Sequence, residues 1–183
     1  IYVPCQYNSI EIFHQNGYRY FKAFNGSKFF LYQGNQLITS NGVDDIYIDN
    51  YKWNGRPIIY KNFGRYGIIT TWPLKIYEEL YQNATIDSKN EVVITLKDDK
   101  YGLVTYHGSV LLNIFDRIEF DEKEVQLQGP NYTYTTKTSC IILTQNSRRY
   151  EYLKIYEKEI NPSAPTSYAE GYYIKHMNLF IKL

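Results

Sequence analysis

Cysteine, histidine, tryptophan and methionine are scarce in this chain, and each scarcity excludes a class of protein. The 183 residues include two Cys, three His, two Trp and one Met. Cys5 and Cys140 are too few for a disulfide scaffold and lack the close spacing of a zinc site. The two could pair with each other, although two buried thiols are the simpler expectation. No apolar run approaches the roughly 18 residues that a membrane-spanning helix needs.

A surplus of charge of one sign is also missing. The chain has 20 Lys and Arg against 19 Asp and Glu, which gives a formal net charge of +1. Non-specific binding of nucleic acid depends on basic side chains that neutralise phosphates. We therefore expect no nucleic-acid partner.

Catalytic motifs are absent from the sequence as well. None of His14, His107 and His176 has a Ser, Cys or acidic partner at a recognised motif spacing. Glycine loops for phosphate and zinc-protease motifs do not occur, and the acidic residues lack the spacing of a calcium loop. We predict a protein that is not an enzyme and uses no metal or cofactor. A Cys5 or Cys140 nucleophile stays open, because catalytic partners can meet in space.

Tyrosine is the abundant residue. The chain contains 21 Tyr and 9 Phe, and aromatic residues make up 17% of it. Tyr has high strand propensity and a polar tip, so we expect most of these side chains to pack on half-buried sheet faces. Exposed Tyr is also common at protein interfaces. The residues that we predict to form an exposed aromatic binding surface are Trp53, Trp72, Tyr106, Tyr132 and Tyr134.

The order of apolar and turn residues predicts an all-β chain. Four Asn-Gly pairs, which begin at residues 16, 25, 41 and 54, are typical of tight turns. Residues 91–97 form the clearest strand, which is rich in β-branched side chains. No stretch longer than about ten residues shows clean helical periodicity. We therefore expect antiparallel strands and hairpins throughout.

One motif recurs along the chain. Lys100-Tyr101-Gly102-Leu103-Val104 precedes a turn at His107-Gly108, and Arg65-Tyr66-Gly67-Ile68-Ile69 repeats its core. Counting the looser copy at Phe29, the aromatic positions 29, 66 and 101 lie 37 and 35 residues apart. A fixed period of about 20–50 residues is the mark of a repeat architecture. The residues to which we assign a structural role in the repeat are Tyr66, Gly67, Tyr101, Gly102, Asp116 and Ile118.

The repeat predicts how the chain is divided. We expect a β-repeat array over residues 1–160, followed by a linker and C-terminal capping strands over residues 161–183. The units of about 35 residues are expected near residues 1–25, 26–63, 64–98, 99–137 and 138–160. One such unit cannot bury its apolar face alone, so it should stack on its neighbours. The sequence does not distinguish a solenoid-like from a propeller-like array.

The glycine and the acid of the repeat have physical explanations. The Gly after the aromatic residue leaves room for a close approach of backbone or ring from the next unit. The acid before Ile or Leu occurs in Asp44-Asp45-Ile46, Glu78-Glu79-Leu80 and Asp116-Arg117-Ile118. We expect it to accept hydrogen bonds from local backbone N–H groups at a turn.

The first ten residues resemble the second half of a unit. Residues 1–10 contain an apolar strand followed by an aromatic, two polar residues and Ile, as residues 110–118 do. The strand that should precede Ile1 would then be missing, and an unpaired sheet edge promotes aggregation unless something covers it. We expect the natural protein to continue upstream.

The motif around Tyr101, with its ending Phe115-Asp116-Arg117-Ile118, resembles the bacterial WG repeat. Tyr7-Asn8-Ser9-Ile10 looks like the ending of that repeat, which is tyrosine, an acidic residue, any residue and isoleucine. In that family a Trp usually precedes the Gly, whereas this chain has Tyr66 in the second copy and Tyr101 in the third. The resemblance covers residues 1–120.

The resemblance implies a mostly β bacterial repeat module that serves interaction or surface functions and has no common catalytic residues. We hypothesise a non-enzymatic protein–protein interaction module within a larger bacterial protein or assembly, such as an accessory of a secretion or toxin system. The alternative is a carbohydrate- or cell-surface-binding module whose exposed Tyr and Trp stack on sugars. A cell-envelope or secreted location is favoured over a cytoplasmic one.

Overall fold

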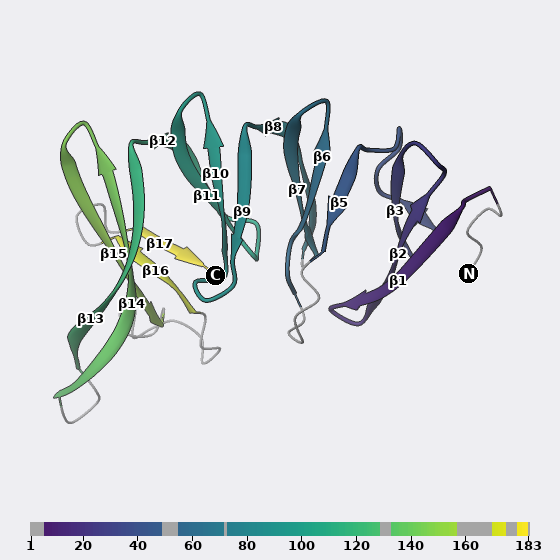
Figure 1. Cartoon of the computed structure of the whole chain (residues 1–183). Coiled ribbons are helices and arrows are strands. Elements are labelled where there is room, and N and C mark those ends of the chain that lie inside the picture. Colours follow the sequence, from purple (N-terminus) through teal and green to yellow (C-terminus); the bar gives the residue numbers. More distant parts are fainter. Residues whose placement is uncertain are drawn as a thin grey trace. The chain divides into compact units, whose positions relative to one another are not determined.

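The computed structural model describes residues 6–48, 55–71, 73–128, 133–156, 170–174 and 179–182. The regular structure of these residues consists of β-strands, without a helix (Figure 1). The prediction of an all-β chain is therefore confirmed. Consistent with this, the described part of the chain contains no helix that is long and apolar enough to cross a membrane.

The strands form four antiparallel sheets, and each sheet is a meander in which strands consecutive in sequence are neighbours in space. The first sheet contains β1 (Ser9–Gln15), β2 (Tyr18–Phe24), β3 (Phe29–Gln33) and β4 (Gln36–Leu37). The second contains β5 (Asp45–Tyr47), β6 (Ile58–Asn62), β7 (Arg65–Thr71) and β8 (Leu74–Tyr81). This order follows from the short connections, because tight turns join only antiparallel neighbours.

The third and fourth sheets continue the pattern. The third contains β9 (Asn83–Asp87), β10 (Val92–Lys97), β11 (Lys100–Thr105) and β12 (Val110–Phe115). The fourth has five strands, which are β13 (Arg117–Gln128), β14 (Thr133–Gln145), β15 (Arg148–Tyr156), β16 (Glu170–Ile174) and β17 (Leu179–Lys182). β16 and β17 occupy the places where the sequence predicts C-terminal strands.

The sequence motif and the sheets are out of phase. The three copies of the motif coincide with β3, β7 and β11, and each of these is the third strand of its sheet. β14 passes through residues 137 and 138, where the sequence-based boundary between the fourth and fifth units falls. The predicted units thus divide the sheets rather than coincide with them, and their boundaries stay a prediction.

Among the described residues, four two-residue turns have positive φ at both central residues. The φ values are 49° and 76° at Asn16-Gly17 and at Phe63-Gly64, 51° and 57° at Asp98-Asp99, and 49° and 64° at Asn146-Ser147. This is the type I′ arrangement, whose twist matches that of the flanking strands. The Asn41-Gly42 pair does not close a hairpin, because it lies in the connection between the first and second sheets.

The chain divides into two compact units, residues 1–86 with 106–108, and residues 87–105 with 109–183. In the first unit the buried cluster joins the first two sheets, through Tyr20 and Leu31 on one and Ile58 and Ile69 on the other. Burial raises the pKa of Tyr20 to about 12, and Gln33 donates a hydrogen bond of 2.9 Å to its hydroxyl.

The second unit has a core of its own. Its buried cluster joins the third and fourth sheets and consists of Val92, Leu103, Phe115, Ile141 and Leu143. The partly buried Ile118, one of the residues assigned to the repeat, packs against this cluster. Each unit therefore buries apolar side chains of one sheet against those of the next, as expected for sheets that cannot fold alone.

Candidate functional site

Three of the five residues of the aromatic surface predicted from the sequence lie outside the part of the chain that the structure describes. Trp53, Trp72 and Tyr132 lie outside the described residues. Tyr106 lies half-buried in the turn between β11 and β12, and the backbone of Tyr134 pairs with that of Leu127 in the β13–β14 hairpin. The surface therefore stays a prediction.

The Tyr-Gly pairs of the motif lie on β7 and β11, each opposite an irregularity in the pairing with the following strand. A Cβ atom on Gly67 would lie 2.2 Å from Cζ of Tyr60, and one on Gly102 would lie 2.6 Å from the carbonyl oxygen of Leu111. A side chain at either position is therefore excluded. In both cases the close neighbour belongs to the same sheet as the Gly. The sequence predicted a neighbour from the next repeat unit instead.

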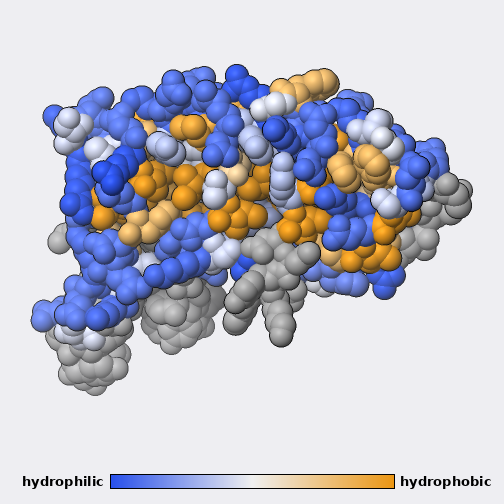
Figure 2. Space-filling view, viewed as in Figure 1, coloured by the Kyte–Doolittle hydropathy of each residue, from blue (hydrophilic) through white to orange (hydrophobic). Residues whose placement is uncertain are grey.

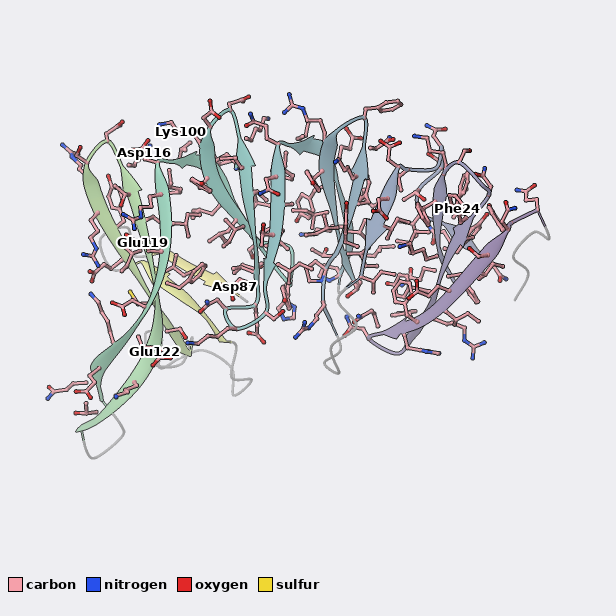
Figure 3. The ribbon with its side chains drawn as sticks, viewed as in Figure 1. Phe24, Asp87, Lys100, Asp116, Glu119 and Glu122 are labelled. Carbon is pink, nitrogen blue, oxygen red and sulfur yellow. The ribbon has the colours of Figure 1, made fainter. Side chains whose placement is uncertain are left out.

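Asp116 joins two sheets of the second unit. Its Oδ1 accepts a hydrogen bond from Nζ of Lys100 at the start of β11, which lies beside it in Figure 3. Its Oδ2 accepts a hydrogen bond of 2.7 Å from the backbone N–H of Asn146, in the turn between β14 and β15. The hydrogen bond from the Lys100 ammonium holds the pKa of Asp116 below its usual value, and the hydrogen bond from the Asn146 N–H lowers that pKa further.

Asp44 has the same arrangement in the first unit. Its Oδ1 accepts a hydrogen bond from Nζ of Lys28, and its Oδ2 accepts one of 2.8 Å from the backbone N–H of Phe63, in the turn between β6 and β7. Lys28 is the principal cause that lowers the pKa of Asp44. We call each set a Lys–Asp clasp: a Lys, the Asp sixteen residues later, and a backbone N–H in the turn of the next sheet.

The clasps correct two expectations for the acid of the motif. The acid does accept a backbone hydrogen bond at a turn, but the turn is not local: it lies 19 residues after Asp44 and 30 after Asp116. The Lys partner was missed, although its constant spacing of sixteen residues from the Asp is visible in the sequence.

The second correction concerns the second sheet. In the backbone pairing, Phe29 lies opposite Val43, Tyr66 opposite Tyr81 and Tyr101 opposite Phe115. These three pairs therefore occupy equivalent positions. The residue after Tyr81, which corresponds to Asp44 and Asp116, is therefore Gln82. The stretch Glu78-Glu79-Leu80, which sequence spacing equates with the two acids, lies instead within β8. The β7–β8 hairpin has one residue more than the other two, whereas the predicted acid lies four residues before Gln82.

A pocket of about 310 Å³ lies beside the clasp of the first unit. It is formed by residues 38–43 and by Tyr60, Asn62, Ile76 and Glu78. Asn62 connects the pocket to the clasp, because its Oδ1 lies 3.3 Å from Nζ of Lys28. The volume is at the lower limit of small-molecule sites. Amide, hydroxyl and carboxylate groups at its walls suit a small polar ligand or a few side chains of another protein.

The reactive side chains that the structure describes do not form a recognisable catalytic group. Among the described residues, no set of three or more His, Cys, Asp and Glu side chains could hold a metal ion. Cys140 is fully buried, with its sulfur 3.8 Å from the carbonyl oxygen of Ile141. Nε2 of His14 accepts a hydrogen bond of 3.4 Å from Nε of Arg19. Cys5 and His176 lie outside the described residues.

The chain matches no family model, no curated protein and no solved structure. The resemblance to WG repeats is therefore carried by the motif residues alone and stays a prediction.

Proposed function

We propose that this protein is a non-enzymatic β-repeat module that binds another protein, within a larger bacterial protein or assembly. The WG-like motif supports the repeat. The two Lys–Asp clasps support it further, because the same three-part contact recurs with the same sixteen-residue spacing between the Lys and the Asp. A stacked array, whether solenoid-like or propeller-like, is the form that such repeats take.

The binding function is supported by the location of the exposed apolar side chains. Among the side chains that the structure describes, every exposed large aliphatic one lies on an edge strand. They are Ile10 and Ile12 on β1, Leu37 on β4, Ile76 and Leu80 on β8, and Val110, Leu112 and Ile114 on β12. Figure 2 shows hydrophobic residues reaching the surface among hydrophilic ones.

Exposed aliphatic residues on a sheet edge have a physical consequence. An edge strand presents unpaired backbone N–H and C=O groups, and soluble proteins normally protect such edges with charged side chains or Pro. Leu112 is 67% exposed and Ile12 is 58% exposed. β12 has no charged side chain, and β1 has one acid, Glu11, between Ile10 and Ile12. An edge of this kind suits a protein partner that adds a strand and covers the apolar row.

A carbohydrate- or surface-binding module is the second candidate function, and the pocket of the first unit favours it. The residues that line this pocket include Ser40, Asn41, Asn62 and Glu78, together with the aromatic Tyr60. Hydroxyl-rich ligands are recognised by such polar groups placed next to an aromatic ring.

The test is a pull-down from the native host with the full chain as bait, followed by titration of the purified partner. We expect one stoichiometric protein partner and weaker binding by Ile12→Lys or Leu112→Lys. Tyr18→Lys is the matched control, because it adds the same charge at an exposed position of β2, which is not an edge strand. Retention on polysaccharide fractions alone would favour the second candidate. Unchanged binding by both edge variants would contradict the role of the edges.

A further inference from the structure

The turn between β6 and β7 contains Phe63, whose side-chain type is unfavourable at the backbone conformation of that position. Phe63 has a φ of 49° and Gly64 a φ of 76°. Positive φ is routine for Gly and accessible to Asn and Asp, but for a bulky side chain it is an outlier that costs free energy. A strained residue of this kind persists only where something else requires it.

The other turns of the same type show what the backbone alone selects. Asn16, Asp98 and Asn146 occupy the same first position, with φ values of 49°, 51° and 49°. Each of them is Asn or Asp, which tolerate this conformation because their short polar side chains can bond to the nearby backbone. The chain thus uses the favoured residues at three of these four turns, and the geometry of the turn does not explain Phe63.

The fold does not explain the Phe63 side chain either. The residue is 86% exposed, so its ring buries little apolar surface. The hydrogen bond to Asp44 comes from the backbone N–H of Phe63, which any residue except Pro would supply. The ring contact that the structure shows is with Nζ of Lys28, 5.0 Å from the ring centroid.

Basic residues lie on both sides of the turn that carries the ring. Lys61 and Arg65 flank the turn, and Lys28 lies against the ring itself. The nearby acid, Asp44, is already bonded to Lys28 and to the Phe63 backbone. An exposed aromatic side chain with a basic rim complements an apolar pocket with an acidic rim, and aromatic residues and Arg are enriched at protein interfaces.

We propose that Phe63 is an anchor that inserts into an apolar pocket of a partner protein, and that Asp or Glu side chains at the rim of that pocket face Lys61 and Arg65. This site deepens the proposed interaction function and rests on it. The strain at Phe63 is then the cost of presenting a rigid aromatic side chain at the tip of a hairpin.

The first arm of the test needs no partner. Phe63→Asn in the full chain should raise the Tm by a few degrees, because Asn is favoured at this φ. Phe63→Ala, which keeps positive φ without the favoured side chain, should gain less. A Tm for Phe63→Asn equal to or below that of the wild type would overturn the argument from strain.

The second arm identifies and measures the contact. A photoreactive benzoyl-phenylalanine at position 63 is irradiated in extract of the native host, and the cross-linked protein is purified and titrated. We expect Phe63→Asn to weaken binding by about tenfold or more, as for an interface anchor, and added salt to weaken it further. Tyr18→Asn is the matched control, because Tyr18 is an exposed aromatic residue of the same unit and should leave the affinity unchanged.

The outcomes separate this site from the proposed function. A partner that binds Phe63→Asn within twofold of wild type would overturn the anchor and leave the interaction function standing. The absence of any protein partner would overturn both. An aromatic tip with a basic rim also suits an anionic membrane surface. Co-sedimentation with phosphatidylserine vesicles that is lost in Phe63→Asn would replace the protein partner with a membrane and overturn the proposal.

Discussion

The two Lys–Asp clasps have the same design and end on different turns. In the first unit Lys28 and Asp44 hold the turn that begins at Phe63, and in the second Lys100 and Asp116 hold the turn that begins at Asn146. The φ value of the turn residue is 49° in both. The clasp thus fixes the backbone of the turn, while the side chain there is free to serve another purpose.

The residue two positions before the Asp also differs. It is Gly42 in the first unit, with a φ of 68°, and Ile114 in the second. The two positions correspond, because each directly precedes the residue that pairs with the aromatic residue of the motif. Gly42 packs against Lys28 and Phe30, whereas Ile114 is 43% exposed. The same hydrogen bonds are therefore compatible with two backbone paths, and each path sets its own demand on the sequence.

The largest effect should come from Gly42→Ala. A Cβ there would lie 2.8 Å from Cζ of Phe30 and 2.9 Å from Cβ of Lys28, at a φ that side chains rarely adopt. We expect a loss of about 3 kcal/mol in the free energy of unfolding, measured by urea denaturation. Ile114→Ala is the control at the corresponding position, with an expected loss below about 1 kcal/mol. Equal losses would remove the distinction between the two paths.

Exchanging the turn residues should give the next largest effect. Asn146→Phe places a bulky side chain at a φ of 49° and should cost about 1–2 kcal/mol, opposite in sign to the gain expected for Phe63→Asn. Thermal unfolding of the two variants measures both. If Asn146→Phe were as stable as the wild type, the clasp would tolerate aromatic residues without strain, and Phe63 would need no special explanation.

The clasps should also make stability sensitive to acid. The pKa values of Asp44 and Asp116 are lowered in the folded state from an ordinary value of 3.8. The unfolded chain therefore binds protons first, so the stabilisation is complete above the unfolded pKa and is lost as pH falls through the lower folded pKa.

Replacement of both acids tests this sign. Asp44→Asn combined with Asp116→Asn should be less stable than the wild type at neutral pH and should lose less stability between about pH 5 and about pH 2. The measurement is the Tm as a function of pH. Parallel curves for the variant and the wild type would show that other groups dominate acid unfolding. Glu119→Gln, in the second unit but outside the clasp, is a suitable control.

The smallest effect should distinguish the two Lys residues. The ammonium group of Lys28 contacts Asp44, Asn62 and the Phe63 ring. The ammonium group of Lys100 donates a hydrogen bond to Asp116. Lys28→Met should therefore lower the Tm slightly more than Lys100→Met. Both losses should be small and should shrink in high salt, because the pairs are partly exposed. A larger loss for Lys100→Met would reverse the comparison.

The fold class and much of the local structure were predictable from the sequence. The turn at Asn16-Gly17, strand β10 (Val92–Lys97) and the terminal strands β16 and β17 follow from turn residues and β-branched side chains, which act within a few residues of the chain. The extended structure of β8 was also expected, from its place in the motif. In these segments local preference and final structure agree.

The sequence by itself determined that the chain forms antiparallel hairpins, with an aromatic-Gly pair in two copies 35 residues apart. The tertiary structure decided how the sheets are delimited, with which turn each Asp bonds, and which neighbour excludes a side chain at Gly67 and Gly102. The physical reason is distance along the chain. Hairpins form between adjacent residues, whereas Asp44 and Asp116 reach turns 19 and 30 residues away, and no local preference encodes such a contact.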